Sequence, residues 1–181
     1  MKSREIVKIL KKGGIGVMPT DTVYGLVGSV LSRAAVERIY RVREREKGKP
    51  FIVLISSLDD LKKFGVKISE EHLVILKVLW SLGETRDKPG PVSVILPVKG
   101  KKFFYIHRGT GAIAFRLPRN GRLRGFLKKT GPLVAPSANV AGKPPARTIA
   151  QAEKYFGGRI DFYLNKGKRN SVPSSIVALV R

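Results

Sequence analysis

Cysteine is absent from the 181-residue sequence, and histidine occurs only twice, as His72 and His107. Without cysteine the chain can form neither a disulfide framework nor a thiol nucleophile. Neither histidine has a second histidine at the spacing that a zinc site requires. These absences exclude disulfide-stabilised folds, cysteine hydrolases and ordinary zinc enzymes. They predict no protein-bound metal, and they make a cytoplasmic location the default expectation.

Motifs of several common enzyme classes are also missing. No G-x-x-x-x-G-K-[ST] loop is present, so a nucleotide would not be held as in P-loop proteins. Gly13, Gly14 and Gly16 do not form G-x-G-x-x-G, and no G-x-S-x-G nucleophile elbow is present. No apolar stretch approaches the roughly 20 residues of a membrane-spanning helix. The sequence therefore predicts a protein without a membrane segment, a P-loop or a serine nucleophile elbow.

Acidic residues are scarce. Thirteen Asp and Glu stand against 36 Lys and Arg, which gives a formal net charge of +23. Such a charge attracts polyanions such as nucleic acid, nucleotide phosphates or anionic membrane, and says nothing about the fold. A basic proteome or a requirement for solubility would give the same composition. Because the basic residues are spread along the chain, a charged face is favoured over a disordered arm.

Apolar residues occur in short runs that alternate between helix and strand patterns. A helix is predicted at residues 3–12, where Ser3 can cap the start, and Ser32 can cap a second helix that stops before Pro50. Further helices are predicted at residues 57–65, with Ser57 as cap, and at 69–82, 121–129 and 150–156. Strands are predicted at residues 15–18, 23–27, 51–55, 92–96, 103–106, 113–115, 133–135, 162–164 and 176–179. This interleaved order predicts a single α/β domain over residues 1–181 around a largely buried sheet.

Polar residues follow several predicted strands, at the place where α/β proteins bind ligands. Residues 19–26 have the sequence Pro-Thr-Asp-Thr-Val-Tyr-Gly-Leu, in which two threonines and an aspartate could contact a ligand. Pro, Thr and Asp are also ordinary turn residues, so a plain turn stays open. The basic segment at residues 43–50 contains Arg43, Arg45 and Lys49, which suit phosphate binding. A charged helix end is the alternative, with Glu44 and Glu46 pairing with these bases at the surface.

Two later segments carry further candidates. Residues 89–93, Pro-Gly-Pro-Val-Ser, lead into one strand, and Arg116 ends another. Burial of Arg116 is costly without an anionic partner, which is either an internal Asp or Glu or a ligand carboxylate. Ser137 and Asn139 follow the strand at residues 133–135 and offer uncharged hydrogen-bond donors, which suit a nucleotide or an amino acid.

In this order the segments resemble the YrdC/Sua5 family of threonylcarbamoyl-AMP synthases, in its short single-domain form. The resemblance rests on P-T-[DE]-T-x-Y-G-L, a basic K-x-R element, P-G-P-x-[ST], the strand-end arginine and the S-A-N loop. It implies a twisted mixed sheet with helices on both faces and a central basic cavity. It also implies a reaction that joins L-threonine, bicarbonate and ATP into threonylcarbamoyl-adenylate and pyrophosphate. A tRNA-modifying transferase system would then use the product for the t6A modification of tRNA at A37.

The resemblance also implies roles for individual residues. Those implied in threonine binding are Thr22, Arg116, Ser137 and Ser174. Those implied in ATP binding are Arg45, Lys49, Asn139 and Arg147. Those implied in catalysis are Arg43 and Arg45. Mg²⁺ is expected to arrive bound to ATP, because no carboxylate cluster is evident to hold it independently.

The sequence departs from the family pattern at three positions. Arg43 replaces the usual lysine of K-x-R, Glu46 replaces a common proline, and Leu54 stands where many relatives have a histidine. The main rival interpretation is a non-catalytic module that binds double-stranded RNA or tRNA, for which the net charge is the argument. A module that binds only the phosphate backbone has no need of the uncharged set Thr22, Ser137 and Asn139.

Overall fold

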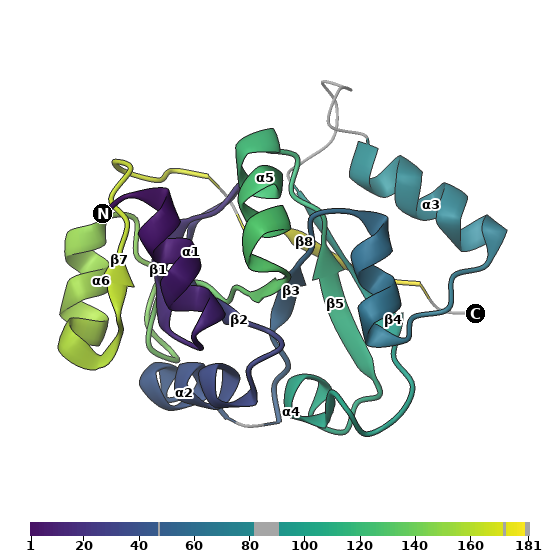
Figure 1. Ribbon diagram of the computed structural model, residues 1–181, viewed down its shortest axis with the longest axis horizontal. Helices are drawn as coiled ribbons and strands as arrows, with labels where there is room; N and C mark the ends of the chain where they lie inside the picture. Colours follow the sequence, from purple (N-terminus) through teal and green to yellow (C-terminus); the bar gives the residue numbers. More distant parts are fainter. Residues whose placement is uncertain (47, 82–90, 172, 180–181) are drawn as a thin grey trace.

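Eight strands form one mixed sheet in the computed structural model, which describes residues 1–46, 48–81, 91–171 and 173–179 (Figure 1). They lie in the order β7-β1-β2-β6-β3-β5-β4-β8. Their bounds are β1 Ile15–Pro19, β2 Tyr24–Ser29, β3 Ile52–Leu54, β4 Val92–Pro97, β5 Ala112–Arg116, β6 Leu133–Val134, β7 Phe162–Tyr163 and β8 Ser175–Ala178. β1 with β7, β3 with β5, and β4 with β8 are parallel, and the other neighbours are antiparallel. The predicted mixed α/β class is confirmed.

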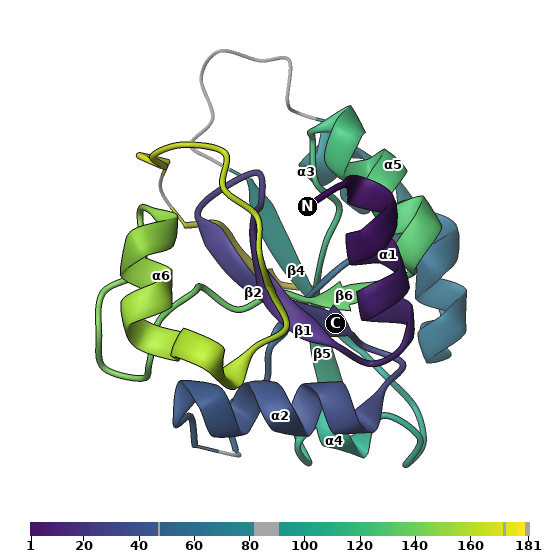
Figure 2. The ribbon, with the colours of Figure 1, turned by 60° about the vertical axis from the view of Figure 1, so that its left-hand side comes forward.

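Helices cover both faces of this sheet, as predicted. α1 Ser3–Lys11 and α5 Gly121–Thr130 lie side by side (Figure 2), and their Leu10 and Leu127 share a core cluster with Leu54 of β3. A second, larger cluster contains core residues of the remaining α-helices and of one 3₁₀ helix. These elements are α2 Arg33–Arg43, η1 Leu58–Phe64, α3 Glu70–Ser81, α4 Phe104–His107 and α6 Ile149–Phe156, and α6 is followed by a short 3₁₀ turn, η2 Gly157–Arg159.

Neighbouring residues of the central strands belong to different core clusters. Val53 packs with the α2 side and Leu54 with the α1–α5 side, and Val134 and Leu133 divide in the same way. Successive side chains of a strand point to opposite faces, so a strand covered on both faces is apolar throughout. The apolar run at residues 51–55 is therefore a central strand.

One predicted strand is wrong. Residues 103–106 enter the helix α4, and the amides of Ile106 and His107 both donate to the carbonyl of Phe103, at 2.8 and 3.1 Å. Phe103 and Ile106 are buried, whereas Phe104 is exposed. A spacing of three between the buried residues suits one helical turn, and in so short an apolar run it is not distinguishable from a strand pattern.

The predicted helix at residues 57–65 is a 3₁₀ helix, and Ser57 makes no side-chain cap. The carboxylate of Asp60 instead accepts the amide and the hydroxyl of Ser56, both at 2.7 Å. A local carboxylate thus satisfies donors that a cap would otherwise satisfy.

The predicted caps of the first two helices have different outcomes. Ser3 is the first residue of α1 rather than its cap, and Glu5 accepts the amide of Lys2 at 3.0 Å. Ser32 caps α2 as predicted, because its hydroxyl accepts the amide of Ala35 at 3.2 Å. The predicted helix end at Leu82, and residues 89–90 of the Pro-Gly-Pro-Val-Ser segment, lie outside the described residues.

Across the described ranges of the chain, no helix has both the length and the apolar character needed to cross a membrane.

Candidate active site

The turn between β1 and β2 is held by its two threonines. The Thr20 hydroxyl donates to the carbonyl of Val23 at 2.8 Å and accepts the amide of Thr22 at 3.1 Å. The hydroxyls of Thr20 and Thr22 lie 3.0 Å apart, and both side chains are buried. The predicted turn is therefore present. It places Asp21 between two fixed threonines.

Asp21 is the internal acid that pairs with Arg116. Nη2 of Arg116 lies 3.0 Å from Oδ1 of Asp21, and the two side chains are only 4% and 6% exposed. Nη1 of Arg116 donates to the Ser174 hydroxyl at 3.0 Å, and the hydroxyls of Ser174 and Ser93 also lie 3.0 Å apart. Burial lowers the pKa of Arg116, and the charge of Asp21 opposes this effect. The cluster joins the β1–β2 turn, β5, β4 and the residue before β8.

This ion pair leaves hydrogen-bonding capacity unused. Both carboxylate oxygens of Asp21 and Nε of Arg116 are buried without a hydrogen-bond partner among the described residues. The 3.0 Å contact is thus a close ion pair that leaves capacity for further hydrogen bonds on both side chains. Buried polar groups without hydrogen bonds are costly in a folded protein, which marks this cluster as a place for a polar ligand.

Arg43, the last residue of α2, contacts the loop after β6. Its Nε donates to the carbonyl of Asn139 at 2.9 Å, and its Nη2 donates to Oδ1 of Asn139 at 3.0 Å and to the Ser137 hydroxyl at 3.4 Å. The Ser137 hydroxyl also donates to Oδ1 of Asn139, at 2.6 Å. The amide nitrogen of Asn139 donates to the carbonyls of Val140 and Lys143. Arg43, Ser137 and Asn139 therefore form one rigid cluster.

Arg43 is a buried cation for which the described residues supply no counter-ion. Its side chain is 3% exposed, and no carboxylate among the described residues pairs with it. Burial, together with the nearby charge of Arg45, lowers the pKa of Arg43 to about 10. The guanidinium is still protonated at pH 7, so an uncompensated positive charge is fixed at this end of α2.

Arg45 and Lys49 differ in their surroundings. Nε of Arg45 donates to the carbonyl of Lys49 at 3.2 Å, and Arg45 pairs with no carboxylate in the described ranges. The ammonium of Lys49 is exposed and lies 2.9 Å from the carboxylate of Glu46, while Glu44 lies 3.7 Å from Arg159. The expected surface pairing with glutamate is therefore present for Lys49 and absent for Arg45.

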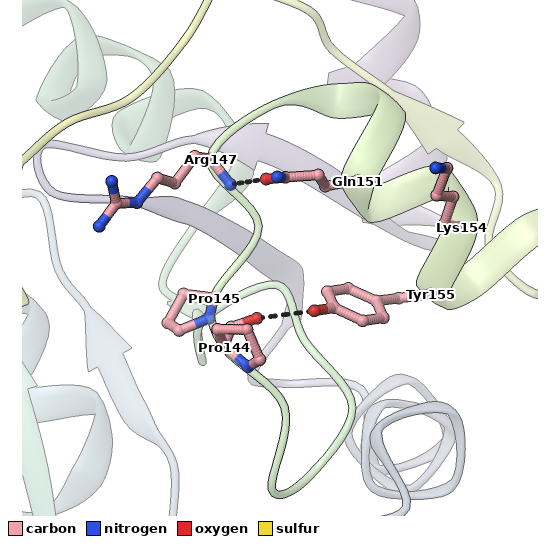
Figure 3. A pocket seen from close by; sticks show the side chains of 6 residues that line it. All are labelled: Pro144, Pro145, Arg147, Gln151, Lys154 and Tyr155. Carbon is pink, nitrogen blue, oxygen red and sulfur yellow. Dashed lines mark hydrogen bonds between the residues drawn. The ribbon is translucent and has the colours of Figure 1, made fainter.

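Arg147 is exposed and lines a separate pocket of about 440 Å³, with Pro144, Pro145, Gln151, Lys154 and Tyr155 (Figure 3). Its guanidinium extends away from Gln151 and Lys154 in that view. Its amide donates to Gln151 at 2.7 Å. The neighbouring amide of Ala146 donates to the carbonyl of Ala138 at 3.0 Å, which closes the loop that carries Asn139. Arg147 thus follows directly on the loop that carries Ser137 and Asn139, and no hydrogen bond joins it to Arg43, Ser137 or Asn139 among the described residues.

The sheet connects the two polar clusters. Ser137 forms a bridge with Gly25 of β2, which follows the turn that carries Thr22 and Asp21. Arg116 pairs in register with Leu54, which pairs in turn with Leu133 of β6. The Arg43–Ser137–Asn139 cluster and the Arg116–Asp21–Ser174 cluster therefore share a scaffold of adjacent strands. The central basic cavity that would join them remains a prediction.

Three residues of these clusters were given no individual role from the sequence. Asp21 is the acid inside the threonine turn, Ser93 follows Pro91 and Val92, and Phe51 lies beneath the basic segment. Asp21 and Ser93 carried a signal, because they lie in the segments 19–26 and 89–93 that the sequence already singled out. The contacts of Ser93 and Phe51 depend on residues distant in the sequence or on a turn that periodicity does not predict.

Fold and site together define an α/β protein whose polar clusters are rich in cations and neutral donors. The family model for Sua5, YciO and YrdC proteins, described as "Telomere recombination", matches residues 8–181. The chain belongs to this family.

Individual relatives are similar over most of the chain. A threonylcarbamoyl-AMP synthase of Pyrococcus abyssi is 30% identical over 98% of this chain and 51% of its own length. One of Nitrosococcus oceani is 31% identical over 96% of this chain and 90% of its own length. The crystal structure of P. abyssi Sua5 complexed with L-threonine is 28% identical, with a TM-score of 0.85 over 98% of this chain and 50% of that one. The chain thus spans about half of the P. abyssi protein and most of the N. oceani protein.

Proposed function

We propose that the chain is an L-threonylcarbamoyladenylate synthase. It would form threonylcarbamoyl-AMP and pyrophosphate from L-threonine, bicarbonate and ATP, as the first step of t6A modification of tRNA at A37. Membership of the family and the names of the relatives from P. abyssi and N. oceani support this proposal. The proposal includes the whole of residues 1–181 as one domain. It also includes a cytoplasmic location, where tRNA and its transferase partners would be met.

The proposal rests mainly on Arg43, whose buried charge no carboxylate of the described residues compensates. A buried cation costs several kcal/mol unless an anion compensates for it, and no carboxylate of the described residues does so. The polyphosphate of ATP is an anion that would compensate for Arg43 and Arg45 together, with Lys49 and Arg147 as further cations near it. Asn139, whose carbonyl and side-chain oxygen fix Arg43, would then line the nucleotide side.

The second cluster suits the other substrate. Threonine carries a carboxylate, an ammonium group and a hydroxyl, and Arg116, Asp21 and Ser174 offer a complement to each kind of group. Nε of Arg116 is buried and has no hydrogen-bond partner among the described residues, so it would donate to a carboxylate that enters this cluster. Thr22 and Ser137 lie on the elements that join this cluster to Arg43. The complex of P. abyssi Sua5 with L-threonine supports the same substrate class.

The chemistry needs cations more than it needs a nucleophile. The amine of threonine and bicarbonate form a carbamate with loss of water. A carbamate oxygen then attacks the α-phosphorus of ATP, a new P–O bond forms, and the bond to pyrophosphate breaks. Negative charges approach one another in this step, so fixed cations and donors supply the main stabilisation of the transition state. Arg43 and Arg45 would do so, and binding three reactants together would lower the entropic barrier.

Mg²⁺ would enter as part of the nucleotide substrate. In the described ranges, no group of three His, Cys, Asp or Glu side chains gathers into a possible metal site. Asp21 is already paired with Arg116. The phosphate oxygens of ATP would therefore be the principal ligands of the ion, as is usual for Mg²⁺ in nucleotide-binding proteins.

The proposal is tested by measuring pyrophosphate release from ATP in the presence of bicarbonate, with each common amino acid in turn. We expect release that requires bicarbonate and is fastest with threonine. Pyrophosphate release at the same rate with every amino acid, or no pyrophosphate release by a folded protein, would refute the proposed activity.

A groove between α1 and α5 favours a second candidate function, the binding of RNA. It has a volume of about 530 Å³ and a floor that includes the half-buried Val7 and Phe126. The cations around it are Arg4, Lys8, Arg122 and Lys129. Together the two helices carry seven basic residues against one acid, Glu5. Such a groove suits a phosphate backbone, with Phe126 available for stacking on a base.

Anisotropy of labelled tRNA over a range of salt concentrations tests this second candidate. We expect the double variant Arg4→Glu, Lys8→Glu to weaken binding and to reduce the salt slope by about 0.7–0.9 for each lost phosphate contact. A control, Lys99→Glu with Lys101→Glu, makes the same change of charge on an exposed loop. Equal weakening in both variants would show that net charge, rather than the groove, accounts for binding.

A further inference from the structure

Phe51 lies beneath both arginines of the basic segment. Its ring centroid is 5.9 Å from Cζ of Arg43 and 5.4 Å from Cζ of Arg45. The ring of Phe51 also stacks on that of Tyr40, with a centroid distance of 4.1 Å and an interplanar angle of 26°. Phe51 is 3% exposed, so the ring is fixed within the core.

Tyr40 is itself held from two sides. Cζ of Arg108 lies 4.1 Å from the Tyr40 ring centroid, and Arg108 pairs with Glu37 at 3.0 Å. The Tyr40 hydroxyl donates to the carbonyl of Lys49 at 2.9 Å, the same carbonyl that accepts Nε of Arg45. Arg108, Tyr40, Phe51 and the two arginines of the basic segment therefore form one continuous series of contacts, which we call the aromatic stack.

The aromatic stack stabilises two like charges that lie close together. Arg43 and Arg45 carry like charges, and the charge of Arg45 contributes to the lowered pKa of Arg43. Neither arginine has a carboxylate partner among the described residues. The face of an aromatic ring carries negative electrostatic potential, which attracts a guanidinium most strongly where water is excluded. A ring stabilises both cations without neutralising them, whereas a carboxylate in its place would compete with phosphate.

We propose that Phe51 is a positioning residue for the anion-binding arginines, and that it orients Arg45 beside the fixed Arg43 before the triphosphate of ATP arrives. This inference rests on the proposed function for the identity of the anion. Without the ring, the hydrogen bonds to Asn139 still hold Arg43, but Arg45 loses a contact that restrains its guanidinium beside a like charge. Part of the binding free energy of the ligand is then spent on ordering Arg45.

The test compares Phe51→Leu with Phe64→Leu. Leucine keeps an apolar side chain and removes the ring. Phe64 is also buried and packs against the aromatic rings of Phe103 and Phe115, whereas Phe51 packs against that of Tyr40. No cation–π contact joins Phe64 to either arginine among the described residues. The control therefore reproduces the loss of core packing without the loss of the cation contacts. Phe51→Tyr retains the ring and should bind Mg-ATP as the wild type does.

Binding of Mg-ATP measured by calorimetry is the primary readout, with the KM for ATP and for threonine as the second. We expect Phe51→Leu to weaken ATP binding by about ten- to a hundredfold, which is the effect of losing one or two partly desolvated cation–π contacts. The KM for threonine should stay within about twofold of the wild type, and Phe64→Leu should bind ATP as the wild type does.

The possible outcomes separate the two proposals. If wild-type protein binds ATP and Phe51→Leu binds it no more weakly than Phe64→Leu does, the positioning role is refuted and the proposed function is unaffected. Weaker ATP binding by a stably folded Phe51→Tyr variant than by the wild type would refute the positioning role as well. If the wild type binds ATP but releases no pyrophosphate, the proposed function fails, and the binding comparison still tests the stack.

Discussion

Replacement of Arg43 by methionine should separate stability from activity. Methionine has a similar reach and no charge. The change removes three hydrogen bonds from Arg43 to the Ser137–Asn139 loop. A hydrogen bond to a charged group contributes about 1.5–3 kcal/mol, and two of the three are short, so the gross loss is about 3–6 kcal/mol. The change also removes a buried cation that has no counter-ion among the described residues, and the desolvation of such a cation costs several kcal/mol.

These two contributions oppose each other and are similar in size. We therefore expect Arg43→Met to change the free energy of unfolding by less than about 2 kcal/mol, as measured by urea denaturation. The rate of pyrophosphate release should nevertheless fall by about a hundredfold or more, because a cation that stabilises the transition state is lost. A stability loss above about 4 kcal/mol would show that Arg43 is a structural residue. Activity within about threefold of the wild type would refute its proposed role.

Three further predictions concern single side chains. Arg45→Ala should lower pyrophosphate release by about a hundredfold or more, and unchanged release in the folded variant would overturn its assignment. Asp21→Asn should destabilise the protein by about 3 kcal/mol, because it leaves Arg116 buried without a counter-ion; a loss below about 1 kcal/mol by denaturation would contradict this. Burial raises the pKa of Asp60, but hydrogen bonds from Lys63 and Ser56 outweigh burial and hold that pKa below its ordinary value. The stability from Asp60 is therefore present above the unfolded pKa of about 3.9 and lost as the pH falls below it, so Asp60→Asn should flatten the acid limb of a stability–pH curve.

The sheet was predictable because its central strands are covered on both faces. The apolar run at residues 51–55 has no polar residue to expose, and β3 lies at its centre. The tetrapeptide at residues 103–106 was not predictable in the same way. Its burial depends on Phe64 and on the β5 face, which are supplied by distant segments. A run of four apolar residues has too few positions to distinguish a spacing of two from one of three.

The candidate site was predictable in its residue types and less so in its partners. A strand-end arginine requires an anion, and the sequence left an internal acid and a ligand open. The folded chain places Asp21 beside Arg116, so an internal acid is present, and binding of a ligand carboxylate by Arg116 stays a proposal. Arg43 was expected as one cation of the basic segment at residues 43–50. In the folded chain it is the last residue of a helix, and it contacts Asn139, 96 residues further along the chain. Such pairings arise from the topology of the sheet, which local spacing does not encode.

The most direct test of the central claim follows the carbon of bicarbonate. The protein would be incubated with ATP, L-threonine and ¹³C-bicarbonate, and the nucleotide products identified by mass spectrometry. If the chain is a threonylcarbamoyladenylate synthase, we expect an adenylate that contains both threonine and the ¹³C label, formed together with an equal amount of pyrophosphate. Nucleotide products that lack the label, or ADP and phosphate in place of pyrophosphate, would contradict it.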